Sequence, residues 1–206
     1  MAYPTVSKPY GFKPINLIGG QVFAGSTRKM RIASGYATNI GYGDLLIRVN
    51  DGTVARSAAT SAKPTGGFAG VFLGCEYINP TNGQLQFQQN WVGGTTVSSG
   101  VITAYVCDDP DALFQVAIVS GTTVVSGVQF TSVGNNATIV DNTPNTTTGD
   151  SQLALSETTA TTDTLPIRIV DVVPDTAFVS GGNTYFPEVI VKFNFGMHAY
   201  ETAVGV

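Results

Sequence analysis

Residues 68–92 read Phe-Ala-Gly-Val-Phe-Leu-Gly-Cys-Glu-Tyr-Ile, then Asn-Pro-Thr-Asn-Gly, then Gln-Leu-Gln-Phe-Gln-Gln-Asn-Trp-Val. The first run is long, apolar and rich in aromatic and branched residues, as in a buried β-strand, and the Asn, Pro and Gly residues after it favour a turn. The last run alternates, with Leu85, Phe87 and Trp91 on one side and glutamines on the other. Only Gln89 breaks the apolar side, so the pattern predicts a strand with that face buried.

The rest of the chain continues in this style, as short β-like runs separated by turn residues. Asn50-Asp51-Gly52-Thr53 contains the Asp-Gly pair that is typical of a hairpin. No stretch of a dozen residues shows the 3.6-residue apolar period of a capped helix, and 24 of the 206 residues are glycine. We therefore expect an all-β protein, an antiparallel β-barrel or β-sandwich of the jelly-roll or β-tulip kind. The strands are expected at residues 28–33, 45–49, 68–78, 84–92, 101–107, 113–119, 122–133, 137–140, 167–173 and 188–195.

Residues 1–20 differ from this body and predict an extended N-terminal arm. Prolines at positions 4, 9 and 14 remove backbone donors and favour extended geometry in the residues before them. Large apolar side chains recur in the same segment, so we expect them to anchor the arm in grooves of its own subunit or of a neighbour. The predicted interface residues are these anchors and nearby cations: Tyr3, Tyr10, Phe12, Lys13, Ile15, Leu17, Ile18, Arg28, Lys29 and Arg31.

Residues 21–206 are expected to form one β-rich domain that carries a loop-rich excursion or small insertion at about 120–164. Within this excursion, residues 141–164 combine Asn, Pro, Thr, Gly and Asp in a loop-like, low-complexity surface.

Charge is scarce and unevenly distributed. Charged residues make up 12% of the chain, about half the usual share, which favours a surface covered by neighbouring subunits, although a Thr- and Ser-rich surface is the alternative. Residues 1–63 hold eight cations and two acids, and residues 64–206 hold two cations and twelve acids. The acidic whole argues against nucleic-acid binding, whereas the basic front favours contact with an acidic protein partner.

Targeting signals are not evident. No window approaches 18 uninterrupted apolar residues, so no transmembrane helix is expected. The first residues, Met1-Ala2-Tyr3-Pro4, do not resemble a secretory signal, so we expect no export signal.

Residues that could support catalysis or metal binding are few. His198 is the one histidine, and its neighbours favour a packing role. Cys75 and Cys107 lie in apolar runs, where we expect buried thiols rather than a disulfide. A zinc site needs three or four Cys or His ligands, and the whole chain has only three such residues, which argues against zinc. The acidic run at 108–111 favours a local turn over a calcium-binding loop. We expect no enzyme activity, no cofactor and no metal.

Five segments of the chain together carry a resemblance to a known family. They are Tyr-Gly-Phe-Lys-Pro at 10–14, Ile-Ala-Ser-Gly-Tyr-Ala-Thr-Asn-Ile at 32–40, Gly-Asp-Leu at 43–45, Gly-Val-Phe-Leu-Gly-Cys-Glu-Tyr at 70–77 and Ala-Tyr-Val-Cys-Asp-Asp-Pro at 104–110. With these segments the chain resembles tailed-bacteriophage virion proteins that act as capsid decoration or cement proteins. The resemblance covers roughly residues 9–118 and the C-terminal strands, and it is weak over 120–165. It implies a β-rich homotrimer that is made in the host cytoplasm and sits on the outer surface of the virion, where it bridges neighbouring subunits of the major capsid protein.

Three other functions are compatible with the residues. The chain could be a head fibre or tail component with residues 141–164 facing outward. It could be a carbohydrate-binding β-sandwich that uses Tyr36, Tyr42, Tyr77 and Trp91. A hydrolase with a carboxylate pair is the fourth reading, although no pair among the fourteen acids stands out.

Overall fold

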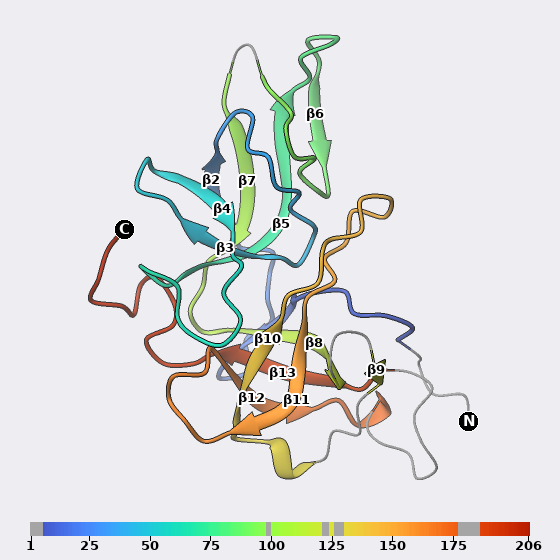
Figure 1. Ribbon diagram of the computed structural model, residues 1–206, viewed down its shortest axis with the longest axis vertical. Helices are drawn as coiled ribbons and strands as arrows, with labels where there is room; N and C mark the ends of the chain where they lie inside the picture. Colours follow the sequence, from blue (N-terminus) through green and yellow to red (C-terminus); the bar gives the residue numbers. More distant parts are fainter. Residues whose placement is uncertain (1–5, 98–99, 121–123, 126–129, 177–185) are drawn as a thin grey trace.

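The computed structural model describes residues 6–97, 100–120, 124–125, 130–176 and 186–206. The prediction of an all-β fold is confirmed, since the only helical segments in this part of the chain are two single turns, η1 (Phe130–Ser132) and η2 (Pro174–Thr176). The strands form two sheets that lie at opposite ends of the long axis of the molecule (Figure 1). No helix in the described ranges is long and apolar enough to span a membrane.

The first sheet closes into a five-stranded barrel. Its strands pair in the order β3-β4-β2-β7-β5, and the β3–β5 pairing completes the ring. All of these pairs are antiparallel except β2–β4. A sixth strand, β6, pairs with β5 outside the ring. The bounds are β2 (Arg28–Ile32), β3 (Leu45–Arg48), β4 (Thr53–Arg56), β5 (Phe68–Ile78), β6 (Leu85–Gln88) and β7 (Ile102–Cys107).

The long strand β5 is the centre of this barrel, because its first half pairs with β3 and its second half with β6. Gly70 and Gly74 have φ values of +140° and +139°, and both come within close range of the neighbouring backbone. A methyl group on Gly70 would lie 2.3 Å from the carbonyl oxygen of Cys107, so glycine is required where β5 and β7 meet. Inside the barrel, Phe72, Trp91 and other apolar side chains form one core.

The second sheet contains seven strands, and five of them also pair in a ring. The order β8-β11-β10-β12-β13 returns to β8 through the β8–β13 pairing, while β1 and β9 pair with β8 outside that ring. The pairing of β8 with β11 is parallel. The bounds are β1 (Lys13–Leu17), β8 (Ala112–Ser120), β9 (Val124–Val125), β10 (Asn136–Val140), β11 (Ala154–Ala160), β12 (Ile167–Val172) and β13 (Glu188–Phe193).

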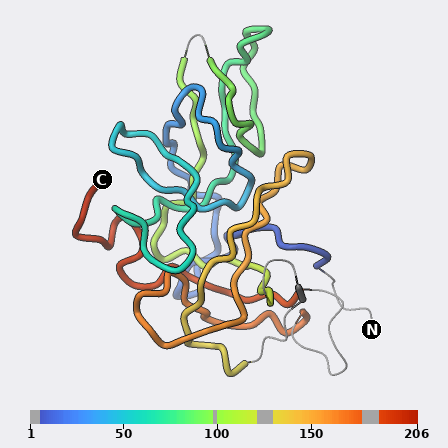
Figure 2. The backbone as a smooth tube through the Cα atoms, viewed as in Figure 1, coloured from blue at the N-terminus to red at the C-terminus, as the bar shows by residue number. Residues whose placement is uncertain are grey.

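The two sheets share a packed boundary. Leu45, Phe68 and Val71 of the barrel belong to the core of the second sheet, where Phe68 stacks on Phe193. A long hairpin connection between β10 and β11, residues 141–153, rises from the second sheet to lie beside the barrel (Figure 2). The molecule is therefore one packed body with two main hydrophobic cores, one for each sheet.

The N-terminal arm is not confirmed as a separate element, because the chain joins its own domain before residue 20. β1 pairs with β8, and Phe12 is 1% exposed inside the core of the second sheet. Apolar side chains from Tyr10 to Leu17 find their partners in this subunit, which explains why a proline-containing segment carries them. Residues 1–5, including the predicted anchor Tyr3, lie outside the described residues.

Two expectations about local structure are wrong. The loop-like surface expected at 141–164 contains β11, because threonine, although polar, is β-branched and fits an extended strand, while Leu155 provides a buried contact. Residues 141–153 form a loop-like connection as predicted, whereas β10 and β11 on either side of it are strands of the second sheet. The face of β6 that carries Leu85 and Phe87 was expected to be buried, but the side chains are 58% and 67% exposed, because β6 lies outside the closed ring.

Candidate protein-protein interface

The basic strand β2 displays its cations on the outside of the barrel. Its sequence alternates so that Met30 and Ile32 enter the barrel core, whereas Lys29 and Arg31 point outward, and Arg28 lies exposed at its start. The parallel pairing with β4 includes only Arg31 with Thr53 and Ile32 with Val54. The beginning of β2 is consequently separated from the β3–β4 hairpin.

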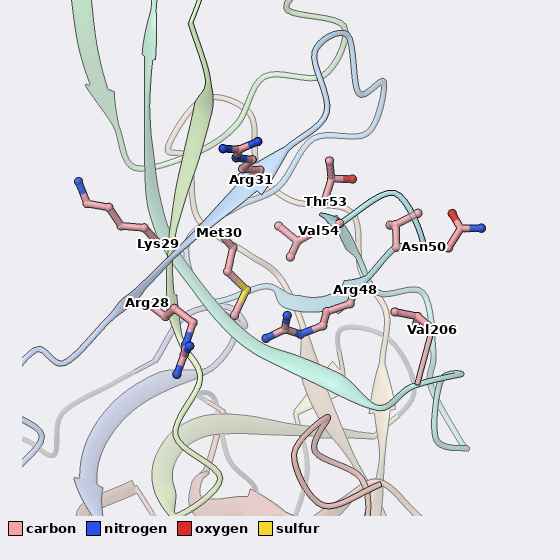
Figure 3. Close-up of a pocket in the computed structure, with 11 residues that line it drawn as sticks. Arg28, Lys29, Met30, Arg31, Arg48, Asn50, Thr53, Val54 and Val206 are labelled. Carbon is pink, nitrogen blue, oxygen red and sulfur yellow. The ribbon is translucent and has the colours of Figure 1, made fainter. Parts of the chain in front are cut away.

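A groove of about 440 Å³ occupies this separation (Figure 3). One wall is residues 28–31 of β2, and the other is the hairpin from Arg48 to Val54, with Val206 at one side. The predicted hairpin turn is confirmed here, since Gly52 has a φ of +82° and its N–H donates to the carbonyl oxygen of Val49. Among the described residues, the lining contains four basic side chains and no acidic side chain: Arg28, Lys29, Arg31 and Arg48.

Tyr200 of the C-terminal tail organises two of these cations. The guanidinium groups of Arg28 and Arg48 each lie 5.6 Å from the centre of its ring. The Tyr200 hydroxyl donates to Asp108 Oδ2 at 2.6 Å and accepts from Arg48 Nη2 at 3.1 Å. Burial, followed by the hydrogen bond to Asp108, raises the pKa of Tyr200. The ring therefore stays neutral and holds Arg48 at the edge of the groove.

The four cations differ in how far they are neutralised. Arg28 is ion-paired with Asp108, and Lys29 is ion-paired with Glu76 at 3.2 Å. Arg31 is exposed, and its side chain makes no hydrogen bond or ion pair with the side chain of any other described residue. Arg48 is held by the neutral Tyr200. Unpaired positive charge therefore concentrates at Arg31 and Arg48, where an acidic group of a partner would gain most.

The predicted interface residues separate into two groups. Arg28, Lys29 and Arg31 are brought together at the groove, and sequence reasoning missed Arg48, which the hairpin places opposite them. The N-terminal residues lie elsewhere. Phe12 is buried, Ile15 and Leu17 are half-buried, and Lys13 and Ile18 are exposed beside β8.

Tyr10 serves its own subunit as well. Its hydroxyl donates to the carboxylate of Glu188, and burial together with this hydrogen bond raises the pKa of Tyr10. Tyr10 is half-buried and its hydroxyl has a partner, so it is a structural anchor of its own subunit.

The histidine and the two cysteines, which were considered for catalysis or metal binding, lie in packed positions. His198 lies between the rings of Phe193 and Tyr200, and its Nδ1 accepts the Tyr200 backbone N–H at 3.2 Å. Burial lowers the pKa of His198 to about 4, so the ring is neutral near pH 7. The prediction of buried free thiols is confirmed, and burial raises the pKa of Cys75 to about 12 and that of Cys107 to about 11.

The acidic run at 108–111 forms a local turn, with Asp109 Oδ1 accepting the N–H of Asp111 at 2.8 Å. Within the described ranges, no group of three or more Cys, His, Asp or Glu side chains is arranged to hold a metal ion. Trp91 is fully buried, stacked edge-on against Tyr77, and its indole N–H donates to the Tyr36 carbonyl. Neither Trp91 nor the buried Tyr77 presents a ring face on which a sugar could stack. Two of the four aromatic residues proposed for carbohydrate binding are therefore not accessible.

Comparison with known proteins adds no neighbour to these observations. No family model, curated protein or solved structure matches the chain. The groove and the resemblance described from the sequence are consequently the two features that bear on the function of this chain.

Proposed function

We propose that this chain is a virion structural protein that decorates and cements a phage head by bridging neighbouring subunits of the major capsid protein. The observation that carries the proposal is the groove between β2 and the β3–β4 hairpin, whose described lining has four basic side chains and no acidic side chain. A carboxylate-bearing segment of a capsid subunit would pair with Arg31 and Arg48, as charge-assisted contacts favour.

The closed barrel supports an assembly role because it presents the groove on a rigid frame. Strands in a closed ring have no free edge along the ring, so the distance between the cations of β2 and Arg48 of β3 is set by the sheet. A preorganised site loses less side-chain freedom on binding. A protein that binds only the assembled lattice stabilises that lattice by mass action. Repeated copies of a modest contact could therefore strengthen a shell.

The proposal is tested by co-sedimentation with purified expanded capsids that lack this protein. Arg31→Glu should weaken binding at least tenfold, because it places a negative charge in the groove. Lys63→Glu is the matched control, since Lys63 is exposed and lies outside the groove. Wild-type binding should also fall as salt is raised, because exposed ion pairs are screened.

Three results would count against this function. Wild-type protein that does not sediment with capsids would contradict it directly. Equal binding by wild type and Arg31→Glu would contradict the role of the groove. Electron microscopy that locates the protein in a tail or head fibre instead of on the shell would favour those alternatives.

A further inference from the structure

Strand β6 is an uncovered edge strand. Among the described residues it pairs with β5 alone, and it lies beyond the point where the β3–β5 pairing closes the barrel. Edge strands present a row of unpaired backbone groups, which proteins usually protect with lysine, proline, a bulge or a covering segment. The sequence of β6, Leu-Gln-Phe-Gln, contains none of these protective residues.

The outward face of β6 is apolar. Leu85 is 58% exposed and Phe87 is 67% exposed, although they project from the same side of the strand. Leu85 lies opposite the half-buried Ile78 of β5, which extends the apolar surface across the sheet. Val101, at the start of β7, is also exposed. Leu85, Phe87 and Ile78 form the apolar part of this edge, and Glu76, which lies opposite Phe87, borders it.

The backbone of β6 also faces outward at the same two residues. The N–H of Asn79 donates to the carbonyl oxygen of Gln84 at 2.8 Å. In an antiparallel pair the bonded and non-bonded positions alternate, so Tyr77 and Gln86 form the next bonded pair. The N–H and C=O groups of Leu85 and Phe87 are therefore directed away from β5, toward the free edge.

Charge beside β6 is sparse and paired. No Asp, Glu, Lys, Arg or His occurs between Glu76 and Asp108 in the sequence. Glu76 of β5 lies opposite Phe87, and its carboxylate is ion-paired with Lys29 at 3.2 Å. The edge therefore carries no net charge, so two copies can approach with little like-charge repulsion. An edge of this kind is best matched by a surface of the same kind.

We propose that β6 pairs antiparallel with β6 of a second copy of this chain, about a two-fold axis that passes beside Gln86. In this register Leu85 of each copy faces Phe87 of the other, and both exchange the backbone hydrogen bonds that point to the free edge. The apolar side chains of both copies fall on one face. Gln86 lies opposite its own equivalent, where the two amides can hydrogen-bond to each other.

The pairing goes beyond the proposed function, because it leaves the groove at β2 accessible. Four residues per strand bury less than the roughly 800 Å² per partner of a standard interface. A reversible dimer with a dissociation constant of about 10 µM or weaker is therefore expected. This two-fold pairing differs from the homotrimer that the resemblance implies, and the sedimentation experiment below distinguishes the two.

The first test is sedimentation velocity of the full-length protein from about 1 to 300 µM. Wild type should shift from monomer toward dimer across this range. Phe87→Lys should weaken the association at least tenfold, because each lysine would replace the apolar contact with Leu85 of the other copy, and the two cations would be diagonal neighbours across the axis. Phe195→Lys is the matched control, since Phe195 is 85% exposed and lies on the connection after β13. A protein that stays monomeric throughout, or an association that only Phe195→Lys weakens, would overturn the proposal.

The second test fixes the register. Gln86→Cys should give a disulfide-linked dimer under mild oxidation, whereas Thr81→Cys in the preceding turn should not. The native thiols are buried and do not compete. Equal cross-linking at both positions would contradict the two-fold axis at Gln86. Capsid binding by Phe87→Lys separates this inference from the proposed function. A variant that no longer dimerises but still binds capsids would show that β6 is needed for the dimer and not for capsid binding.

Discussion

Asp44 and Arg56 form a buried ion pair that connects the barrel to the second sheet. Arg56 Nε donates to Asp44 Oδ2 at 2.9 Å, and the side chains are 8% and 0% exposed for Arg56 and Asp44, respectively. Asp44 also accepts the Ser151 hydroxyl at 2.6 Å, and Arg56 Nη2 donates to Asp141 Oδ1 at 2.6 Å. Ser151 and Asp141 belong to the long connection between β10 and β11, so one network joins both parts of the molecule.

Because the ion pair is buried, removing one partner should lower the free energy of unfolding strongly. Arg56→Met should lower the free energy of unfolding by about 3–5 kcal/mol, because it leaves Asp44 charged and buried without its cation. Urea unfolding monitored by the fluorescence of the single tryptophan would measure it. The double variant Asp44→Asn/Arg56→Met should lose less than the sum of the single variants. Additive losses would show that the two residues act independently.

Truncation tests how deeply the N-terminal segment belongs to the fold. Removing residues 1–8 should lower the unfolding temperature only slightly, because it deletes the contacts of Val6 with Phe186 but retains β1 and Phe12. Removing residues 1–20 deletes both, and the loss should be at least that of Phe12→Ala, about 3–5 kcal/mol. Thermal unfolding followed by circular dichroism would distinguish the two. An equally stable longer truncation would show that β1 is a dispensable attachment.

Gly70 tests the contact between β5 and β7. Gly70→Ala should destabilise the protein by about 2 kcal/mol or more, since the methyl group would collide with the Cys107 carbonyl and the φ of +140° disfavours a side chain. Gly83→Ala is the matched control, because Gly83 also has a positive φ but no atom within 4 Å of the added methyl group. Similar losses for both variants would assign the effect to φ alone.

The strands were predictable to the extent that local pattern determines them. β5 occupies the predicted residues 68–78 because an apolar run ends in an unmistakable turn. Alternation in β6 correctly grouped Leu85 with Phe87, but it could not tell whether the ring would cover that face. Ring closure depends on the pairing of β3 with β5, which no local pattern contains.

The candidate interface was predictable only in part for the same reason. The cations of β2 are adjacent in sequence and therefore visible as a cluster. Arg48 reaches the groove through the β3–β4 hairpin, and Tyr200 reaches it from the other end of the chain. The anchors at Tyr10 and Phe12 were recognised as anchors, but their hydrophobicity could not say which subunit they bind.

His198 makes stability depend on pH. Its pKa is about 4 in the folded protein and near 6.5 when unfolded, so the unfolded chain binds more protons between these values. Stability from this group is fully present above pH 6.5 and is lost as the pH falls toward 4, by roughly 2–3 kcal/mol. Urea unfolding at pH 7.5 and pH 4.5 would measure the loss. His198→Asn, which keeps an acceptor near Nδ1, should reduce this pH dependence, and an unchanged slope would assign it to the carboxylates.

Tyr200 tests whether the C-terminal tail shapes the groove. Tyr200→Phe removes the hydrogen bonds to Asp108 and Arg48 but keeps the ring beneath both guanidinium groups, whereas Tyr200→Leu removes the aromatic face as well. Capsid binding should therefore fall modestly, about threefold, for Phe and about tenfold or more for Leu, since each cation–π contact at an exposed site contributes about 0.5–1 kcal/mol. Co-sedimentation measures both, with thermal unfolding to confirm that each variant is folded. If Tyr200→Leu binds capsids as well as wild type while Arg31→Glu does not, capsid binding requires the cations of the groove but not the aromatic ring of the C-terminal tail.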